Sequence, residues 1–397
     1  MKNTSIFTLF FFFGIVYTLA QNKTCDCKTD LDFVVEKMKK MPSYKKQIKG
    51  QKSTAFETTF VRLSDKMKQP IAVEACFKLL LQQMDLVKDN HANISMITSV
   101  VDVNNKLKQH PKSKKNLVKL KEKLYKKNRT EKEGIYKYGD SLLLGIYFET
   151  NSKNLSGVVL ESKLEHWNVG DLCFHAYPVS ANKYNLYHYK LRTKAPRLVK
   201  SIAFENGRLL SYKKIDNVFN FELPDKNQTE LEFKQLNKNT QYLYFGHFSN
   251  SKKNKHKAFF ADTKNRLTAK NIIIDLRSNT GGNKKYSDSY LKLLKNKNIY
   301  ILTNAFTASN AEQFTLKLKK IKNSKHLGQT TFGIISYGIN YGTSYSTPSG
   351  NFTIKPTDMN FHKFYQFESK GIIPEIPLDF KSDWIAQTLK IIASDKK

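Results

Sequence analysis

Two polar turns, each following an apolar stretch, contain the groups with the clearest potential for catalysis. One apolar stretch has three consecutive isoleucines and leads to Gly281 and Gly282, and the other gives way to small residues that include Ser309. Glycine lets the backbone approach another group closely, and adjacent amides can stabilise an oxyanion. A serine beside a helix N-terminus lies where negative charge is favoured. Together the turns indicate acyl transfer through a serine nucleophile, although Thr307 or Ser309 taken alone is more simply a helix cap.

Four motifs, in order along the chain, resemble those of the C-terminal processing, or tail-specific, serine peptidases. They are Asp275-Leu-Arg277-Ser-Asn279-Thr280-Gly281-Gly282, Thr307-Ala308-Ser309-Asn310-Ala311-Glu312, Leu327-Gly328-Gln-Thr-Thr331-Phe332-Gly333 and Glu368-Ser-Lys-Gly371-Ile-Ile-Pro374-Glu375. The resemblance covers roughly residues 242–380. It implies a crotonase-like α/β catalytic domain with Ser309 as the nucleophile, a peptide or protein substrate, and neither a cofactor nor a metal.

The catalytic base distinguishes two branches of this family. The Ser/Lys branch has its lysine in a Phe-Gly-Lys-Gly segment, and here that segment reads Phe332-Gly-Ile-Ile335, so the lysine is absent. Similarity to the tricorn-core branch implies instead a histidine base and a late acidic residue. His91 follows an amphipathic helical stretch in the matching context, and Glu368 lies in the closing motif. His247 is the reserve candidate for the base, and a surface carboxylate is the simpler interpretation of Glu368.

The resemblance also implies how the other residues of the two turns act. The oxyanion is expected on the backbone N–H of Asn310 and on that of Gly281 or Gly282. Asp275 and Arg277 are expected to brace the turn and not to react. Peptide hydrolysis by a serine endopeptidase is the activity that this set of roles implies.

Other titratable residues have simpler expected roles. Glu312 is expected in the first turn of a helix, where a carboxylate is favoured by the helix dipole. Four histidines are expected on the surface because they lie among Lys, Asn or Tyr: His110, His188, His256 and His362.

The chain is expected to divide into three parts after a leader. Residues 21–133 show helical spacing of apolar residues, and residues 134–236 contain short β-type runs. From 237 to 397 strands alternate with helices, so the predicted fold class is α/β, or α+β overall. The middle part lacks the Gly-Leu-Gly-type loop of the PDZ modules that many members of the resembled family carry. The expected strands are 142–148, 158–160, 186–191, 218–223, 242–248, 271–276 and 299–303, and the expected late helices are 287–294 and 310–321.

The first residues indicate export from the cytoplasm. Lys2 precedes an apolar stretch over 6–19, and small Thr18 and Ala20 suit a cleavage site, so 1–20 is predicted to be a signal peptide. The mature chain is then periplasmic or extracellular, and no later stretch is apolar enough to span a membrane.

Cysteine chemistry fits that compartment. The four cysteines are Cys25, Cys27, Cys76 and Cys173, which allow three pairings of two bridges. A bridge between Cys25 and Cys27 would be strained, so one of them is expected to reach Cys76. Their spacing does not favour zinc.

The charge leaves two further function classes open. With 67 Lys and Arg against 34 acidic residues, the formal net charge is +33, but Arg is scarce and Lys is spread along the whole chain. Such a pattern is more typical of a solvated basic surface than of specific nucleic-acid recognition. One alternative is an inactive relative that binds peptides or a polymer. The other is polyanion binding by a basic helix expected over 106–127.

Overall fold

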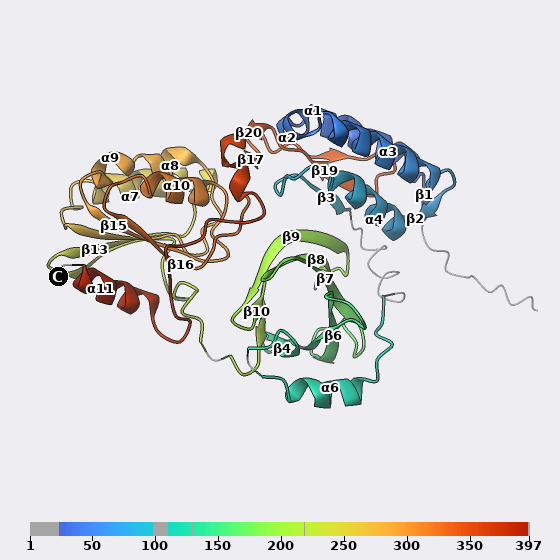
Figure 1. Ribbon diagram of the computed structural model, residues 1–397, viewed down its shortest axis with the longest axis horizontal. Coiled ribbons are helices and arrows are strands. Elements are labelled where there is room, and N and C mark those ends of the chain that lie inside the picture. The colour runs from blue at the N-terminus through green and yellow to red at the C-terminus, as the bar shows by residue number, and fades with distance from the viewer. Residues whose placement is uncertain (1–23, 98–109, 129, 218, 396–397) are drawn as a thin grey trace, which may run out of the picture.

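The computed structural model describes residues 24–97, 110–128, 130–217 and 219–395. They form a helical layer near the N-terminus, a closed barrel and a helix-covered sheet, all labelled in Figure 1. This mixed architecture confirms the predicted α/β fold class. The leader predicted over 1–20 lies outside the described residues.

The sheet that precedes Ser309 has six strands in the order β12-β13-β14-β15-β16-β21. β12 is antiparallel to β13, and the other neighbouring pairs are parallel. The strands are β12 (Leu231–Asn237), β13 (Thr240–Phe245), β14 (Asn271–Asp275), β15 (Asn298–Thr303), β16 (Ser324–Gly328) and β21 (Ile376–Pro377). On one face lie α7 (Lys253–Thr263), α8 (Lys284–Asp288), α9 (Leu291–Leu294) and α10 (Asn310–Leu318), and on the other lies α11 (Trp384–Ser394) (Figure 1).

The isoleucines of β14 explain why helices cover both faces of this sheet. Ile272 and Ile274 belong to the same core as Phe314 of α10, whereas Ile273 packs in the core that contains Trp384 of α11. Both faces of the strand are therefore buried, as three consecutive isoleucines predict. Since β14 and β15 are parallel, the polar turns that follow them lie at the same edge of the sheet.

The β-rich middle region closes into a barrel. Its strand order is β10-β11-β4-β5-β6-β7-β8-β9, with β10 pairing to β9 to complete the ring. The bounds are β4 (Gly134–Tyr138), β5 (Leu142–Phe148), β6 (Leu155–Ser162), β7 (Leu172–Ser180), β8 (Lys183–Tyr189), β9 (Pro196–Glu205), β10 (Arg208–Leu209) and β11 (Tyr212–Lys214). The strand expected over 142–148 is β5 itself. The one expected over 218–223 is wrong, because residues 219–223 form no strand and Val218 lies outside the described residues.

The outside of the barrel carries a short basic helix. α6 (Leu117–Tyr125) packs Leu120 and Leu124 against Val158 of β6, which leaves its lysines toward solvent. It is shorter than the helix expected over 106–127, of which residues 106–109 are not described.

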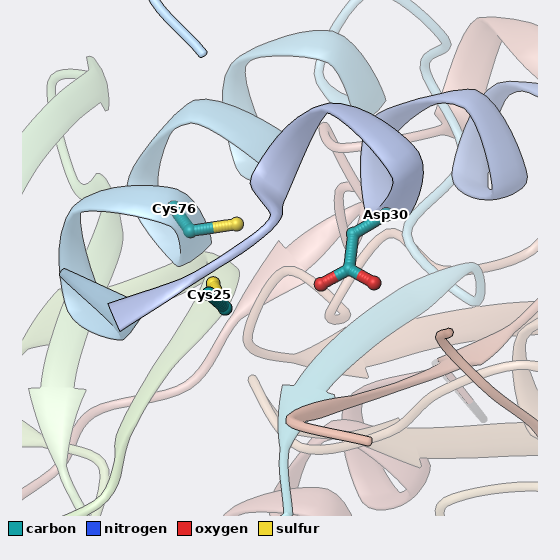
Figure 2. A group of neighbouring side chains, drawn as sticks. All are labelled: Cys25, Asp30 and Cys76. Atoms are coloured by element: carbon teal, nitrogen blue, oxygen red, sulfur yellow. The ribbon is translucent and has the colours of Figure 1, made fainter. Parts of the chain in front are cut away.

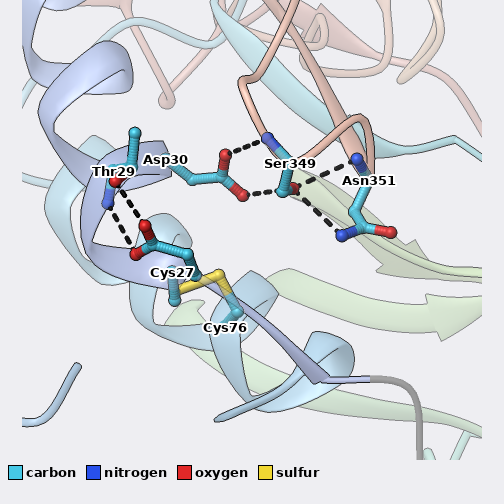
Figure 3. The surroundings of a disulfide bond; sticks show 7 residues. Cys27, Thr29, Asp30, Cys76, Ser349 and Asn351 are labelled. Carbon is cyan, nitrogen blue, oxygen red and sulfur yellow. Dashed lines mark hydrogen bonds between the residues drawn. A yellow bond between two sulfur atoms is a disulfide. The ribbon is translucent and has the colours of Figure 1, made fainter. Parts of the chain in front are cut away.

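The helical layer consists of α1 (Cys27–Lys40), α2 (Pro42–Gln47), α3 (Gln51–Asp65) and α4 (Val73–Met84), with a small hairpin of β1 (Thr24–Cys25) and β2 (Ile71–Ala72). A disulfide joins Cys27 to Cys76, one of the two pairings expected for Cys76, and so ties α1 to α4 (Figure 3). Asp30 of α1 accepts two hydrogen bonds from Ser349, a residue of the C-terminal region.

A second connection to the C-terminal region positions the candidate base. β3 (Asn93–Met96) pairs with β19 (Phe352–Lys355), which also pairs with β18 (Tyr345–Ser346). β17 (Tyr337–Gly338) and β20 (Met359–Asn360) form a further two-stranded sheet, and the 3-10 helices span Asn250–Lys252 and His362–Phe367. Segments more than 200 residues apart thus form one layer.

Cys25, Asp30 and Cys76 lie close together but do not form a metal site. Their sulfur and oxygen atoms lie within 4.8 Å of one another (Figure 2). The Cys76 sulfur is already bonded to Cys27, and both Asp30 oxygens accept hydrogen bonds from Ser349.

Cys173 is buried in the barrel, where burial raises the pKa of its thiol.

The expectation that four histidines lie on the surface is wrong for three of them. His110, His188 and His256 are buried. His110 lies edge-on to Trp167 and donates from Nε2 to the Leu172 carbonyl oxygen, and His256 stacks on Tyr286. Aromatic partners from other segments cover the rings of His110 and His256, and His188 accepts a hydrogen bond from Arg197 of the neighbouring strand, so neighbouring polar residues in the sequence were a poor guide. No helix among the described residues is long and apolar enough to cross a membrane.

Candidate active site

Ser309 and His91 meet although 218 residues separate them in the chain. His91 Nε2 lies 3.1 Å from Ser309 Oγ, within hydrogen-bonding reach. Ser309 is the N-cap residue of α10, and His91 lies between α4 and β3. The helical layer therefore supplies one residue of the pair, and the six-stranded sheet supplies the other.

The backbone at Ser309 has an uncommon conformation. Its φ of 57° and ψ of −123° lie in a region that residues other than glycine rarely occupy, and such strain concentrates at functional sites. The Ser309 N–H donates to Glu312 Oε2 over 3.0 Å, which holds the turn closed.

The three amides expected to bind an oxyanion differ in their partners. The Gly281 N–H donates to Asn279 Oδ1 over 2.8 Å. Within the part of the chain that the structure describes, the N–H groups of Gly282 and Asn310 have no hydrogen-bond partner. Gly281 passes so close to the nucleophile turn that a Cβ there would lie 2.7 Å from Asn310 N and 2.7 Å from Ser309 Cβ. Gly282 and Asn310 are therefore the amides open to a ligand.

Glu312 is buried and accepts hydrogen bonds from two segments of the chain, so its role extends beyond the first turn of α10. Its Oε1 accepts hydrogen bonds from Thr331 Oγ1 and Gly333 N, and its Oε2 accepts from Ser309 N and Ile334 N. Burial raises the pKa of this carboxyl to about 7, against the four donors that favour its ionised form. The sequence analysis missed this role, although the Ser-x-x-Glu spacing from Ser309 is a capping-box signal that could have indicated it.

Glu368 reaches the candidate base through Asn90. Glu368 Oε1 accepts the Asn90 N–H over 2.9 Å, and Oε2 accepts the N–H groups of Ile335 and Ser336. The carboxylate is fully buried. Among the described residues, it forms no hydrogen bond with the His91 or Ser309 side chain. Burial raises its pKa, while the three backbone donors act in the opposite direction. The structure thus brings Glu368 to the site as a group that orients the segment before His91.

Asp89 holds the other side of that segment. Its Oδ1 accepts the N–H groups of His91 and Ala92, and its Oδ2 accepts the Thr357 hydroxyl. Burial lowers the pKa of His91, and the nearby Asp89 charge raises it in part. His91 Nδ1 is buried and has no hydrogen-bond partner among the described residues. For Nε2 to accept the Ser309 proton, Nδ1 must carry the ring hydrogen.

A lysine from the barrel supports the same loop as Glu312. Lys183 of β8 is buried and donates to the carbonyls of Thr331 and Phe332 at 3.1 and 2.6 Å. Burial lowers its pKa to about 8. The barrel is thereby connected to the loop that carries Gly333.

The remaining predicted residues occupy supporting positions. Arg277 donates through Nε and Nη2 to Asp275 and through Nη1 to two carbonyls of the segment after the barrel, so this pair braces the turn before Gly281. His247 contacts His256 and the N–H of Ser249, and it makes no contact with Ser309.

Known proteins show similarity to this chain in sequence and in structure. Residues 283–378 match the model of peptidase family S41. One similar solved structure is the photosystem II D1 C-terminal processing protease, at 11% identity over 94% of this chain and 98% of that chain, with a TM-score of 0.41. Mature CPAF complexed with lactacystin is similar at 12% identity over 92% of this chain and 97% of that chain, with a TM-score of 0.41. The tricorn protease is similar at 10% identity over 93% of this chain and 37% of that chain, with a TM-score of 0.44. At TM-scores below 0.5 these likenesses assign no activity. A comparison with curated proteins finds no match.

The family match includes the nucleophile turn and the closing motif but not the segment that carries His91. Ser309, Glu312 and Glu368 all lie within 283–378. The resemblance inferred from the four motifs is therefore confirmed at the level of the match: residues 283–378 are similar to peptidase family S41.

Proposed function

We propose that this chain is an exported serine endopeptidase in which His91 activates Ser309. The observation that carries the proposal is the 3.1 Å separation between His91 Nε2 and Ser309 Oγ. A serine hydroxyl is a weak nucleophile unless a base within hydrogen-bonding distance removes its proton. Because burial lowers the pKa of His91, the ring is neutral near pH 7 and able to accept that proton.

The reaction then follows the usual course of acyl transfer. Ser309 Oγ attacks the carbonyl carbon of the peptide while its proton moves to His91 Nε2. The tetrahedral oxyanion accepts hydrogen bonds from the N–H groups of Gly282 and Asn310, which are unpartnered within the described residues. His91 gives the proton to the leaving amine, and a water molecule deprotonated by His91 releases the acyl group from Ser309.

Glu368 and Glu312 act as positioning residues in this mechanism. Glu368 fixes Asn90, the residue directly before the base, and Glu312 fixes the N–H of Ser309. Two buried carboxylates thus hold the segments that carry the base and the nucleophile. Small displacements of reacting groups cost large factors in rate, so such supports matter even without contact to the substrate.

Labelling with a fluorophosphonate probe tests the proposal directly. We expect the purified mature protein to be labelled, and labelling to be lost in Ser309→Ala and in His91→Ala. His247→Ala is the matched control, since this histidine makes no contact with Ser309, and it should be labelled like the wild type. A folded wild-type protein that is not labelled would instead favour an inactive relative that binds peptides or polymers.

Export is proposed from the N-terminal sequence. The apolar stretch over 6–19 and the small residues Thr18 and Ala20 support cleavage after residue 20. N-terminal sequencing of the protein recovered after expression of the full chain with a secretion system should begin at Gln21. An intact Met1 on the exported protein would contradict this proposal.

A further inference from the structure

A cavity of about 370 Å³ lies where the helical layer, the barrel and the loop after β16 meet. Its apolar wall includes Leu81 and Met84 of α4, Ile94 of β3, Leu198 of β9 and Phe332. A concave apolar surface with a few polar groups is typical of a ligand site.

This cavity adjoins the candidate active site. Asn90 and Ala92, which flank His91 in the chain, both line it. Ile334 lines it as well, and its N–H donates to Glu312, the carboxylate that also accepts the N–H of the nucleophile. A peptide bound across the nucleophile can therefore extend a neighbouring side chain into this cavity.

Every charged side chain that lines the cavity is basic. Lys190, Arg197 and Lys200 line it, and of these only Lys200 forms an ion pair, with Asp85, among the described residues. Arg197 donates from Nε to His188, an uncharged partner, and no partner among the described residues takes its terminal Nη groups. Lys190 is half-buried and Arg197 is exposed at the cavity rim. Partial desolvation lowers the pKa of both, and the Arg197 charge lowers that of Lys190 further. Two neighbouring cations thus lack a counter-charge.

We propose that this cavity is a specificity pocket that binds a carboxylate of the substrate through Lys190 and Arg197. The carboxylate belongs to an acidic side chain or to the C-terminus of the peptide, and the apolar wall takes the adjoining carbon atoms. The proposal rests on the proposed peptidase function for the position of the peptide. A guanidinium suits carboxylate recognition because it can donate two parallel hydrogen bonds. The net charge of +33 favours the approach of acidic peptides.

Binding to a Ser309→Ala protein tests the pocket without requiring turnover. The probes are fluorescein-labelled decapeptides of alternating Ala and Leu in which one Glu is placed at each position in turn, matched by Gln at the same position. Each is made with a free and with an amidated C-terminus. Fluorescence anisotropy then compares Ser309→Ala alone with the same protein carrying Lys190→Met and Arg197→Met, and with a control carrying Arg192→Met. Arg192 is exposed between β8 and β9 and does not line the cavity.

We expect at least one carboxylate-bearing peptide to bind about tenfold more tightly than its neutral match. That preference should disappear in the Lys190→Met/Arg197→Met protein and persist with Arg192→Met. A preference for Glu over Gln identifies a side-chain carboxylate, and a preference for the free over the amidated C-terminus identifies the terminal one. Equal affinities for charged and neutral peptides, or no binding at all, would overturn the pocket assignment. Probe labelling of wild-type Ser309 is measured separately, so a failure of the pocket is distinguishable from a failure of the peptidase proposal.

Discussion

Asn90 donates its backbone N–H to Glu368 Oε1 over 2.9 Å, and this contact joins two segments that lie 278 residues apart. The Asn90 side chain continues the connection by donating to Gly333 O and Ser369 Oγ. The residue before the candidate base is therefore fixed to the closing motif of the peptidase domain. Since the base and the nucleophile belong to different parts of the fold, contacts of this kind set their separation.

Glu368→Gln should slow catalysis in a protein that still folds. The amide keeps one acceptor oxygen but presents an NH₂ group to backbone donors, so either Asn90 or the Ile335 and Ser336 amides lose their acceptor. We expect the rate of probe labelling at Ser309 to fall by about 10- to 100-fold, because the base shifts away from the nucleophile. The free energy of unfolding should fall by about 1–3 kcal/mol.

The matched control for this variant is Glu375→Gln. Glu375 lies nearby in the sequence, but it is exposed and pairs with Lys319. Its labelling rate, measured by intact-mass spectrometry, and its unfolding in urea should both be close to those of the wild type. An equal loss of labelling in both variants would show that Glu368 has no special relation to His91.

Gly281→Ala should remove activity by blocking the nucleophile turn. An added Cβ would lie 2.7 Å from both Asn310 N and Ser309 Cβ, and the φ of +92° is itself unfavourable for alanine. Displacing an oxyanion donor costs about 10²-fold or more in rate. Gly342→Ala separates the two effects, since its φ is +72° but nothing lies within 4 Å of the added Cβ. We expect labelling to be lost only in Gly281→Ala, and a comparable loss in both would contradict the steric argument.

The pH dependence of labelling should report the environment of His91. Burial lowers the pKa of His91 below the usual histidine value of 6.5, so the neutral, active form persists to lower pH and the acid limb should have its midpoint below 6.5. Asp89→Asn removes the charge that raises this pKa, and the midpoint should move lower still. Asp65→Asn, at the exposed end of α3, is the control and should leave the midpoint unchanged. A midpoint above 6.5 in the wild type would mean that the Asp89 charge outweighs burial.

Local patterns predicted the elements around Ser309 well. The apolar runs of β14 and β15 predicted these two strands, and the small residues before α10 predicted the turn at Ser309. A strand buried on two faces and a helix start both have strong sequence signals. The approach of His91 to Ser309 was predicted only through the resemblance to a family. No local pattern contains it, since it depends on β3 pairing with β19 about 260 residues away.

Other parts of the fold had no local signal. The barrel closes through β10 and β11, strands of two and three residues, which are too short to show alternation. The burial of the histidines and the hydrogen bonds of Glu312 depend on which distant groups pack around these side chains. Glu312 illustrates the limit: its place in the first helical turn was predicted, but its bonds to Thr331 and Gly333 come from a loop that only the tertiary structure brings near.

The disulfide should stabilise the layer that carries the base. Cys27 and Cys76 enclose a loop with a sequence separation of 49, for which chain entropy gives about 4 kcal/mol. The Cys27→Ser/Cys76→Ser variant should therefore unfold at a lower urea concentration, and its free energy of unfolding should be lower by about this amount. The double substitution is required because the Cys25 sulfur lies within 4.8 Å of that of Cys76, close enough to form a new bridge in a single variant.

The same variant also tests whether the bridge acts on folding or on the active site. The bridge lies at the far end of α4 from His91, so the reaction itself does not need it. In the absence of urea, the labelling rate of Ser309 should stay close to that of the wild type, and it should fall at the lower urea concentration at which the layer unfolds. Cys25→Ser, which keeps the bridge, should follow the wild type in both measurements. Loss of labelling in a fully folded double variant would instead show that the bridge sets the distance between His91 and Ser309.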